Sequence, residues 1–188
     1  DISDTYSMRA FVEKEEEKAQ VRLSQWENMY RKDGLTGLLS HSAFMNDVEQ
    51  RILEDDKRIL FIMMDCDKFK QYNDTYGHIA GDKFLLIMSQ SITKSLSEDD
   101  LACRMGGDEF ATALFFDKDI DEKYIYEKAN QLFNKINLTI KSVEGGQGIS
   151  MGATLSHLGG DTSKRLYADA DKALYESKNS GSGKINII

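Results

Sequence analysis

The segment with the strongest chemical signature is RMGGDEF at residues 104–110. Two glycines are followed directly by two carboxylates, Asp108 and Glu109, and apolar runs stand on both sides. This order predicts a strand, a tight turn and a second strand. Glycine allows a ligand to approach the backbone closely, and the paired acids would face that ligand. The alternative is an ordinary turn with solvated charges.

A second acidic cluster follows the apolar run 59–64, which is short enough for a fully buried strand. Asp65 and Asp67 are poorly placed there for packing and well placed for a hard cation. Magnesium takes few protein oxygens and completes its shell with water and phosphate. Lys68 and Lys70 stand beside the acids and suit the phosphates themselves. The alternative is a strand end that simply becomes solvated.

The polar stretch 71–82 contains spaced glycines and leads into a predicted helix. Its Asn and Asp side chains, among them Asn73 and Asp82, are able to pair with the edge of a purine. The same residue types also serve as turn and N-cap residues, so both interpretations stand at this point.

Five segments in one order make the chain resemble the catalytic domain of the diguanylate cyclases, the family named after the GGDEF motif. The resemblance covers about residues 31–184, and five ordered segments are far more specific than one short motif. The segments lie at residues 33–38 (DGLTGL), 65–70 (DCDKFK), 73–82, 106–110 (GGDEF) and 168–178.

The resemblance implies that two GTP molecules condense into cyclic di-GMP with release of two pyrophosphates. It makes Asp65 and Asp108 the main ligands of one or two Mg²⁺ (or Mn²⁺) ions, with help from the carbonyl of Cys66. Glu109 is expected to be a further ligand or to help activate the attacking hydroxyl. Divalent ions of this kind clamp a triphosphate and stabilise charge in phosphoryl transfer.

The resemblance also implies the contacts to the nucleotide. Asn73 and Asp82 are expected to read the Watson–Crick edge of guanine, because a carboxylate accepts from N1–H and the N2 amine together. Lys70 and Lys178 are expected to hold the terminal phosphates, together with backbone N–H groups near Lys68 and Phe69. Gly106 and Gly107 are expected to leave room for the nucleotide.

Because one domain holds one GTP, the product requires two domains that face each other. Each 3′-hydroxyl then attacks the α-phosphate of the partner's GTP in line. A homodimer is therefore expected, and the N-terminal segment is the expected device for controlling its formation.

Three departures from the family pattern carry expectations of their own. Residues 97–100 (SEDD) lack the arginine of the frequent Arg-x-x-Asp inhibitory site, and Asp100 alone cannot form a bidentate fork, so product inhibition is not expected there. Residues 181–184 (GSGK) replace a usual Gly-Arg-Asn, which predicts lower triphosphate affinity with Lys184 as a partial substitute. Residues 40–41 (SH) replace Asn-Arg without a derivable consequence.

Composition agrees with a small enzyme. With 40% hydrophobic residues in 188, the chain can supply a proper core. The net charge of −8 argues against a broad nucleic-acid surface and does not oppose binding of one nucleotide. Cys66 and Cys103 are too few for a disulfide framework, fit a reducing compartment and are expected to be buried thiols.

No apolar stretch approaches the ~18 residues of a membrane span, and no signal peptide is apparent. A cytoplasmic location without membrane contact by this fragment is expected, although the parent protein could be membrane-anchored. The first residue is Asp1 rather than methionine, which indicates a piece of a longer protein with an upstream sensory domain.

Two domains are expected, a helix at 1–31 and the catalytic domain at 32–188. Residues 4–30 contain neither Gly nor Pro and place apolar residues at helical intervals. A two-stranded coiled coil is plausible, and in this family such a helix resembles a signalling stalk. The alternative is one amphipathic helix lying on its own domain.

Beyond residue 32, mixed helices and hairpins predict an α+β sandwich. Helices are expected at 42–53, 83–96, 121–136 and 166–178, and a hairpin is expected from strands at 138–143 and 149–155. The resemblance sharpens this to a five-stranded, mainly antiparallel sheet surrounded by helices, similar to the core of nucleotidyl cyclases and polymerase palms.

Three other functions remain open at this point: a catalytically silent GTP sensor, a cyclase that makes a dinucleotide containing adenine, and a dimerising signalling module. Turnover of GTP separates the first from an active enzyme, and Asp82 favours guanine over adenine. A signalling module would keep its function after a charge change at Asp108.

Overall fold

The computed structural model describes residues 2–54, 56–157 and 159–188. The chain divides into two compact units, Asp1–Lys32 and Asp33–Ile188. The first unit is one helix, α1 (Ile2–Tyr30), uninterrupted by Gly or Pro. It leaves large apolar side chains such as Phe11 and Trp26 more than half exposed. Within the described residues, no helix is both long enough and apolar enough to span a membrane.

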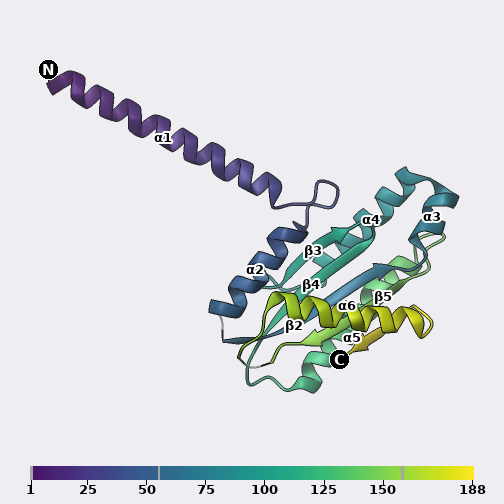
Figure 1. The fold of residues 1–188 in the computed structure, drawn as a ribbon. Coiled ribbons are helices and arrows are strands. Elements are labelled where there is room, and N and C mark those ends of the chain that lie inside the picture. The colour runs from purple at the N-terminus through teal and green to yellow at the C-terminus, as the bar shows by residue number, and fades with distance from the viewer. Residues whose placement is uncertain (1, 55, 158) are drawn as a thin grey trace. The chain divides into compact units, whose positions relative to one another are not determined.

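The second unit is a six-stranded sheet with helices on both faces (Figure 1). Its elements are β1 (Leu39–Ser40), α2 (His41–Glu54), β2 (Lys57–Cys66), α3 (Phe69–Tyr76), α4 (His78–Thr93), β3 (Leu101–Gly106), β4 (Glu109–Asp117), α5 (Glu122–Lys141), β5 (Ile149–Leu155), α6 (Ser163–Asn179) and β6 (Ile185–Ile187). The strand order is β1-β3-β4-β2-β5-β6.

The α+β class is confirmed, but the expected strand count of five is wrong. Four long strands pair antiparallel at the centre, β3 with β4, β4 with β2, and β2 with β5. The short strands β1 and β6 add to the two edges in parallel orientation. Neither edge strand has enough residues to show a period of two in the sequence.

The expected strand at 138–143 does not exist, because α5 continues to Lys141. Ile136 and Ile140 are fully buried one helical turn apart, whereas Leu138 between them is 73% exposed. A strand would place all three on one side, so only the helix buries the two isoleucines and leaves Leu138 in water. The predicted hairpin between 138–143 and 149–155 is therefore wrong.

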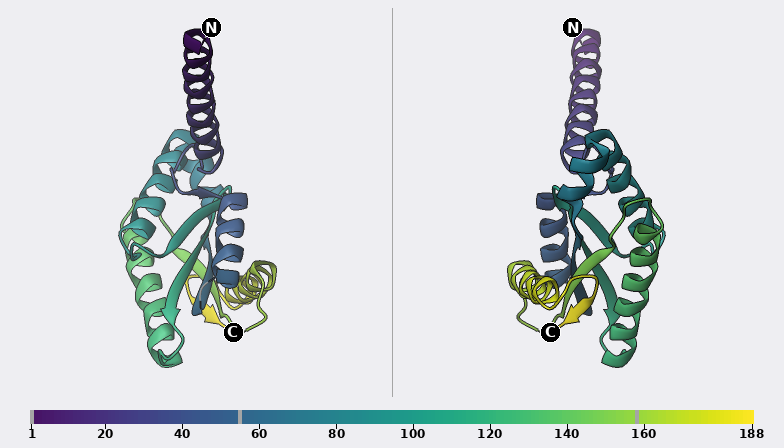
Figure 2. Two further views of the ribbon diagram at one scale, coloured as in Figure 1. Left: turned by 90° about the vertical axis from the view of Figure 1, so that its left-hand side faces the viewer. Right: turned by 90° about the vertical axis from the view of Figure 1, so that its right-hand side faces the viewer.

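The sheet lies between two helical layers, α4 and α5 on one face and α2 and α6 on the other (Figure 2). Strand β2 is buried on both faces and supplies alternate side chains to each layer. Leu60 and Ile62 join the core under α4 and α5, and Phe61 and Met63 join the core under α2 and α6. Burying each of these side chains stabilises the fold by roughly 1.5–3 kcal/mol. The same alternation directs Asp65, two residues after Met63, toward the face that carries α6.

Helix α6 lies unusually close to β5 because Gly152 has no side chain. A Cβ atom at Gly152 would stand 2.0 Å from the backbone nitrogen of Leu174 and 2.3 Å from the carbonyl oxygen of Ala170. Only glycine permits this approach. The close packing brings the last turn of α6 against the central strands.

Candidate active site

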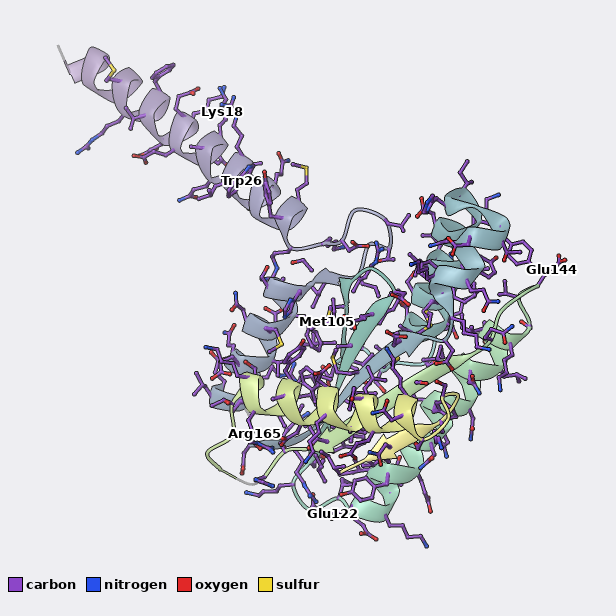
Figure 3. The ribbon with its side chains drawn as sticks, turned by 45° about the vertical axis from the view of Figure 1, so that its right-hand side comes forward. Lys18, Trp26, Met105, Glu122, Glu144 and Arg165 are labelled. Carbon is purple, nitrogen blue, oxygen red and sulfur yellow. The ribbon has the colours of Figure 1, made fainter. Side chains whose placement is uncertain are left out.

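The segment RMGGDEF forms the turn between β3 and β4, as its sequence predicts. Gly107 has φ of 53° and Gly106 has φ of 154°, so the turn uses backbone conformations that glycine adopts without strain. Met105, just before the turn, lies on β3 (Figure 3). After the turn, Glu109 stands directly opposite Asp65 in the β4–β2 register, so the two side chains share one face of the sheet.

Asp65 is held at the end of β2 by an ion pair with α6. Its side chain is buried, and Lys178 Nζ lies 2.6 Å from Asp65 Oδ2. Burial raises the pKa of Asp65, and the negative charge of Asp108 raises it further. The hydrogen bond and positive charge of Lys178 lower that pKa without cancelling the rise. Asp65 is therefore a carboxylate with insufficient positive charge around it.

Asp108, on the neighbouring turn, likewise has a raised pKa. Burial raises its pKa, and the charge of Glu109 adds to the effect, whereas its own backbone N–H and the charges of Lys178 and Arg104 oppose it. Lys178 thus serves two carboxylates with a single charge. This shortage of positive charge is the electrostatic setting that a divalent cation relieves.

Cys66 has its side chain in the hydrophobic core rather than in the site. Burial raises the pKa of its thiol well above the usual range, and the charges of Asp108 and Asp65 raise it further. Only its backbone carbonyl is left for the expected metal contact.

The donor set around Asp65 fits Mg²⁺. The nearby side-chain donors are carboxylate oxygens, which magnesium prefers, and magnesium needs only one or two of them when phosphate oxygens and water complete its shell. In the part of the chain that the structure describes, no group of three or more His, Cys, Asp or Glu side chains is arranged to hold an ion. The protein alone therefore offers only some of the ligands that Mg²⁺ needs, and the oxygens of a triphosphate would add the others.

Asn73 on α3 and Asp82 on α4 form a separate polar group. The side-chain oxygen Oδ1 of Asn73 is buried and has no hydrogen-bond partner. It rests against Gly81, where a Cβ atom would lie only 1.8 Å away. Asp82, the next residue, is exposed. A buried acceptor without a partner is costly, so this position is suited to a ligand that donates a hydrogen bond.

The start of α3 is the segment that was expected to bind phosphate. Lys68 precedes the helix in the left-handed conformation with φ of 57°, and no side chain caps the first turn. Phe69 packs its ring against Phe84 at a centroid distance of 5.5 Å, so only its backbone is available to a ligand. Lys70 is exposed. Free N–H groups at a helix start favour phosphate.

The site residues expected from the sequence thus fall into two groups. Asp65 and Lys178 form an ion pair, the charge of Lys178 also acts on Asp108, and Glu109 lies opposite Asp65 in the sheet. The other expected residues lie at α3 and α4, namely Lys68, Lys70, Asn73 and Asp82.

Arg104 was not assigned a role from the sequence, yet it braces the signature turn. Its Nε donates to the carbonyl oxygen of Gly107 at 2.8 Å, and its Nη1 lies 3.4 Å from both carboxylate oxygens of Asp33. Asp33 also accepts from the backbone N–H and hydroxyl of Thr36. Burial raises the pKa of Asp33, but the bonds from Thr36 and the charge of Arg104 outweigh it and the pKa is lowered.

Asp67 likewise has a positioning role that the sequence did not reveal. Its Oδ1 accepts from the hydroxyl of Ser150 at 2.7 Å, and its Oδ2 accepts from the backbone N–H of Gly183 at 3.0 Å. Asp67 therefore anchors the loop after α6 to the end of β2. In that loop, the ammonium group of Lys184 donates to the carbonyl of Ser180. Lys184 is thus engaged locally, and its role as a partial substitute for the missing arginine stays a prediction.

Comparison with known proteins identifies the family of this chain. The family model described as "Diguanylate cyclase, GGDEF domain" matches residues 31–184, and the chain belongs to this family. It is 32% identical over 170 residues to the probable diguanylate cyclase DgcT of Escherichia coli K12, covering 85% of this chain and 36% of that protein. It is 31% identical over 177 residues to the cyclic di-GMP phosphodiesterase PdeR of the same strain, covering 93% of this chain and 26% of PdeR. The chain thus spans about a third or less of these two relatives.

Solved structures have the same fold. The coiled coil and GGDEF domain of DgcB from Caulobacter crescentus, in complex with c-di-GMP, matches with a TM-score of 0.82 at 24% identity, covering 97% of this chain and 98% of that one. The GGDEF domain of PA1120 from Pseudomonas aeruginosa matches with a TM-score of 0.70 at 28% identity, covering 83% and 93%.

Replacement of Arg104 by Lys should loosen the signature turn. Lysine keeps the charge but cannot donate to Gly107 and contact Asp33 at the same time. We expect the free energy of unfolding, measured in urea, to fall by about 1–2 kcal/mol. The exposed control Arg22→Lys should change it by less than about 0.5 kcal/mol. Equal stability of Arg104→Lys and wild type would contradict the bracing role.

Replacement of Asp108 by Asn should stabilise the nucleotide-free protein at pH 7. Because the pKa of Asp108 is raised on folding, the folded state binds its proton more tightly than the unfolded state does. The resulting destabilisation appears as the pH rises through the ordinary value of about 3.9 and is complete above the raised pKa. We expect the Tm at pH 7 to rise by about 2 °C, with no gain at pH 3. The exposed control Asp99→Asn should not show this pH-dependent gain.

Proposed function

We propose that the chain is an active diguanylate cyclase domain that condenses two GTP molecules into cyclic di-GMP and two pyrophosphates. The observation that carries this proposal is the ion pair of the buried Asp65 with Lys178 beside an intact GGDEF turn, whose half-buried Asp108 is also affected by the charge of Lys178. Membership of the family supports it. The name of PdeR shows that membership alone does not decide activity, so the residues of the site carry the argument.

The roles of the reacting groups follow from their positions. Asp65 and Asp108 would hold Mg²⁺, and a bound Mg²⁺ would neutralise charge on the triphosphate. Lys70 and Lys178 would hold the terminal phosphates until pyrophosphate leaves. Glu109 is exposed on the same face as Asp65, where it can accept the proton of the attacking 3′-hydroxyl.

Recognition of guanine is assigned to Asn73 and Asp82. The unpartnered Oδ1 of Asn73 can accept a hydrogen bond, and the exposed carboxylate of Asp82 can accept from N1–H and the N2 amine. Adenine has no donor at N1 and no N2 amine, so it would leave the carboxylate unpaired. This chemistry supports GTP rather than ATP as the substrate.

Catalysis requires two copies of the domain, because each active group holds one nucleotide and the product joins two. The exposed apolar side chains of α1, such as Phe11 and Trp26, support dimer formation through this helix. The domain would be the cytoplasmic output module of a longer protein, since its substrate GTP is cytoplasmic and the chain spans only part of its relatives.

Feedback by the product at residues 97–100 is not part of this proposal. The carboxylate of Asp100 accepts from the backbone N–H groups of Ser97, at 2.8 Å, and Phe115, at 3.2 Å. Asp100 therefore fixes its own loop, and Ser97 stands where the family often has arginine. Added cyclic di-GMP is expected not to inhibit through these residues.

The central test is incubation with GTP and Mg²⁺ at several protein concentrations, followed by chromatographic identification of the product. We expect cyclic di-GMP, formed at a rate per chain that rises with protein concentration. Asp108→Asn should lower the rate by about 10³-fold or more, because it removes a ligand carboxylate. ATP in place of GTP should give no cyclic product. Bound but unreacted GTP at high protein concentration would reject the cyclase in favour of a silent GTP sensor.

Replacement of Gly81 by Ala should weaken GTP binding without unfolding the domain. The added Cβ would overlap Oδ1 of Asn73, and the side chain of Asn73 can move away whereas a backbone could not. We expect the Kd for GTP, measured by calorimetry in the presence of Ca²⁺ to limit turnover, to rise about tenfold. Gly34→Ala, where the new Cβ meets nothing within 4 Å, is the matched control and should leave the Kd unchanged.

A further inference from the structure

Lys178 occupies the position that the metal would need. Its Nζ lies 2.6 Å from Oδ2 of Asp65, an oxygen at the buried end of β2. Within the described residues, it is also the cation that counters both Asp65 and Asp108 in the absence of nucleotide. A Mg²⁺ ion about 2.1 Å from the same oxygen would stand very close to the ammonium group. Two cations on one oxygen repel each other, so the metal and Lys178 compete.

The geometry allows Lys178 to leave. It lies in the last turn of α6, and its side chain is 37% exposed whereas that of Asp65 is 12% exposed. Its long side chain can therefore rotate away while the carboxylate stays in place. A triphosphate would offer the departing ammonium group a new anionic partner.

We infer that Lys178 is a resident counter-cation, which holds the metal position of the nucleotide-free protein and yields it when metal and triphosphate arrive together. This inference rests on the proposed function, since it concerns the metal site of that reaction. Its consequence is that the free protein binds divalent metal weakly. Metal binding then depends on nucleotide, and the positive charge near Asp65 is present in both states.

The test measures Mn²⁺ binding to the full chain without any nucleotide, by the electron paramagnetic resonance signal of free Mn²⁺. Lys178→Gln should bind Mn²⁺ about tenfold more tightly than wild type, because one competing positive charge is gone. Lys172→Gln removes the same charge from an exposed position of the same helix and should change the Kd less than about twofold. Unchanged or weaker Mn²⁺ binding by a folded Lys178→Gln protein would overturn the inference, because a purely structural lysine would predict that result.

A second measurement does not depend on the folding of Lys178→Gln. In ¹⁵N-lysine-labelled wild type, the ammonium resonance of Lys178, assigned with Lys178→Arg, should not shift with Mg²⁺ alone at millimolar concentration. It should shift when Mg²⁺ and 3′-deoxy-GTP, which lacks the attacking hydroxyl, are added together. A resonance that stays unchanged with both would overturn the inference.

The two proposals fail separately. Cyclic di-GMP formation together with Mn²⁺ affinity that does not respond to Lys178→Gln would reject the counter-cation and keep the cyclase. Tighter Mn²⁺ binding by Lys178→Gln in a protein that makes no product from GTP would keep the counter-cation and reject the cyclase.

Discussion

The partial removal of water from two like charges at one end of the sheet is the constraint on which this domain depends. Asp65 and Asp108 both have raised pKa values because burial raises them more than the charge of Lys178, joined by that of Arg104 at Asp108, lowers them. A carboxylate in this condition destabilises the folded protein at neutral pH. A divalent cation and a triphosphate would offset this electrostatic destabilisation. A purely structural site would have no reason to keep two such carboxylates, whereas a ligand-binding site does.

The residues around the two acids hold the backbone of the site in place rather than neutralise its charge. Arg104 ties the signature turn to Asp33, and Asp67 ties the loop after α6 to β2 through Ser150 and Gly183. Both anchors use hydrogen bonds to charged groups, which are stronger than bonds between neutral groups. These two anchors fix the backbone around Asp65 and Asp108, and Lys178 is the side chain that pairs with Asp65.

The sequence predicted the strongly patterned parts of the fold but not the long-range bonds, and the roles of the site residues stay predictions. Strand β2 and the GGDEF turn were predictable because continuous apolar runs and glycines are local signals. The strand expected at 138–143 was wrong because Leu138 and Ile140 alternate as in a strand, whereas the buried pair is Ile136 and Ile140, which lie one helical turn apart. The bond from Asp67 to Gly183 joins residues 116 positions apart, and no local pattern encodes such a pairing.

The alternation of β2 connects these observations to the candidate site. A strand buried on both faces must send every second side chain toward the same helical layer, so Asp65 necessarily faces α6. Gly152 then sets how close α6 lies, because any larger residue would push the helix away from β5. The ion pair of Lys178 with Asp65 is therefore a consequence of core packing as much as of charge. A substitution that moved α6 outward would weaken the hold on Asp65 without touching a charged residue.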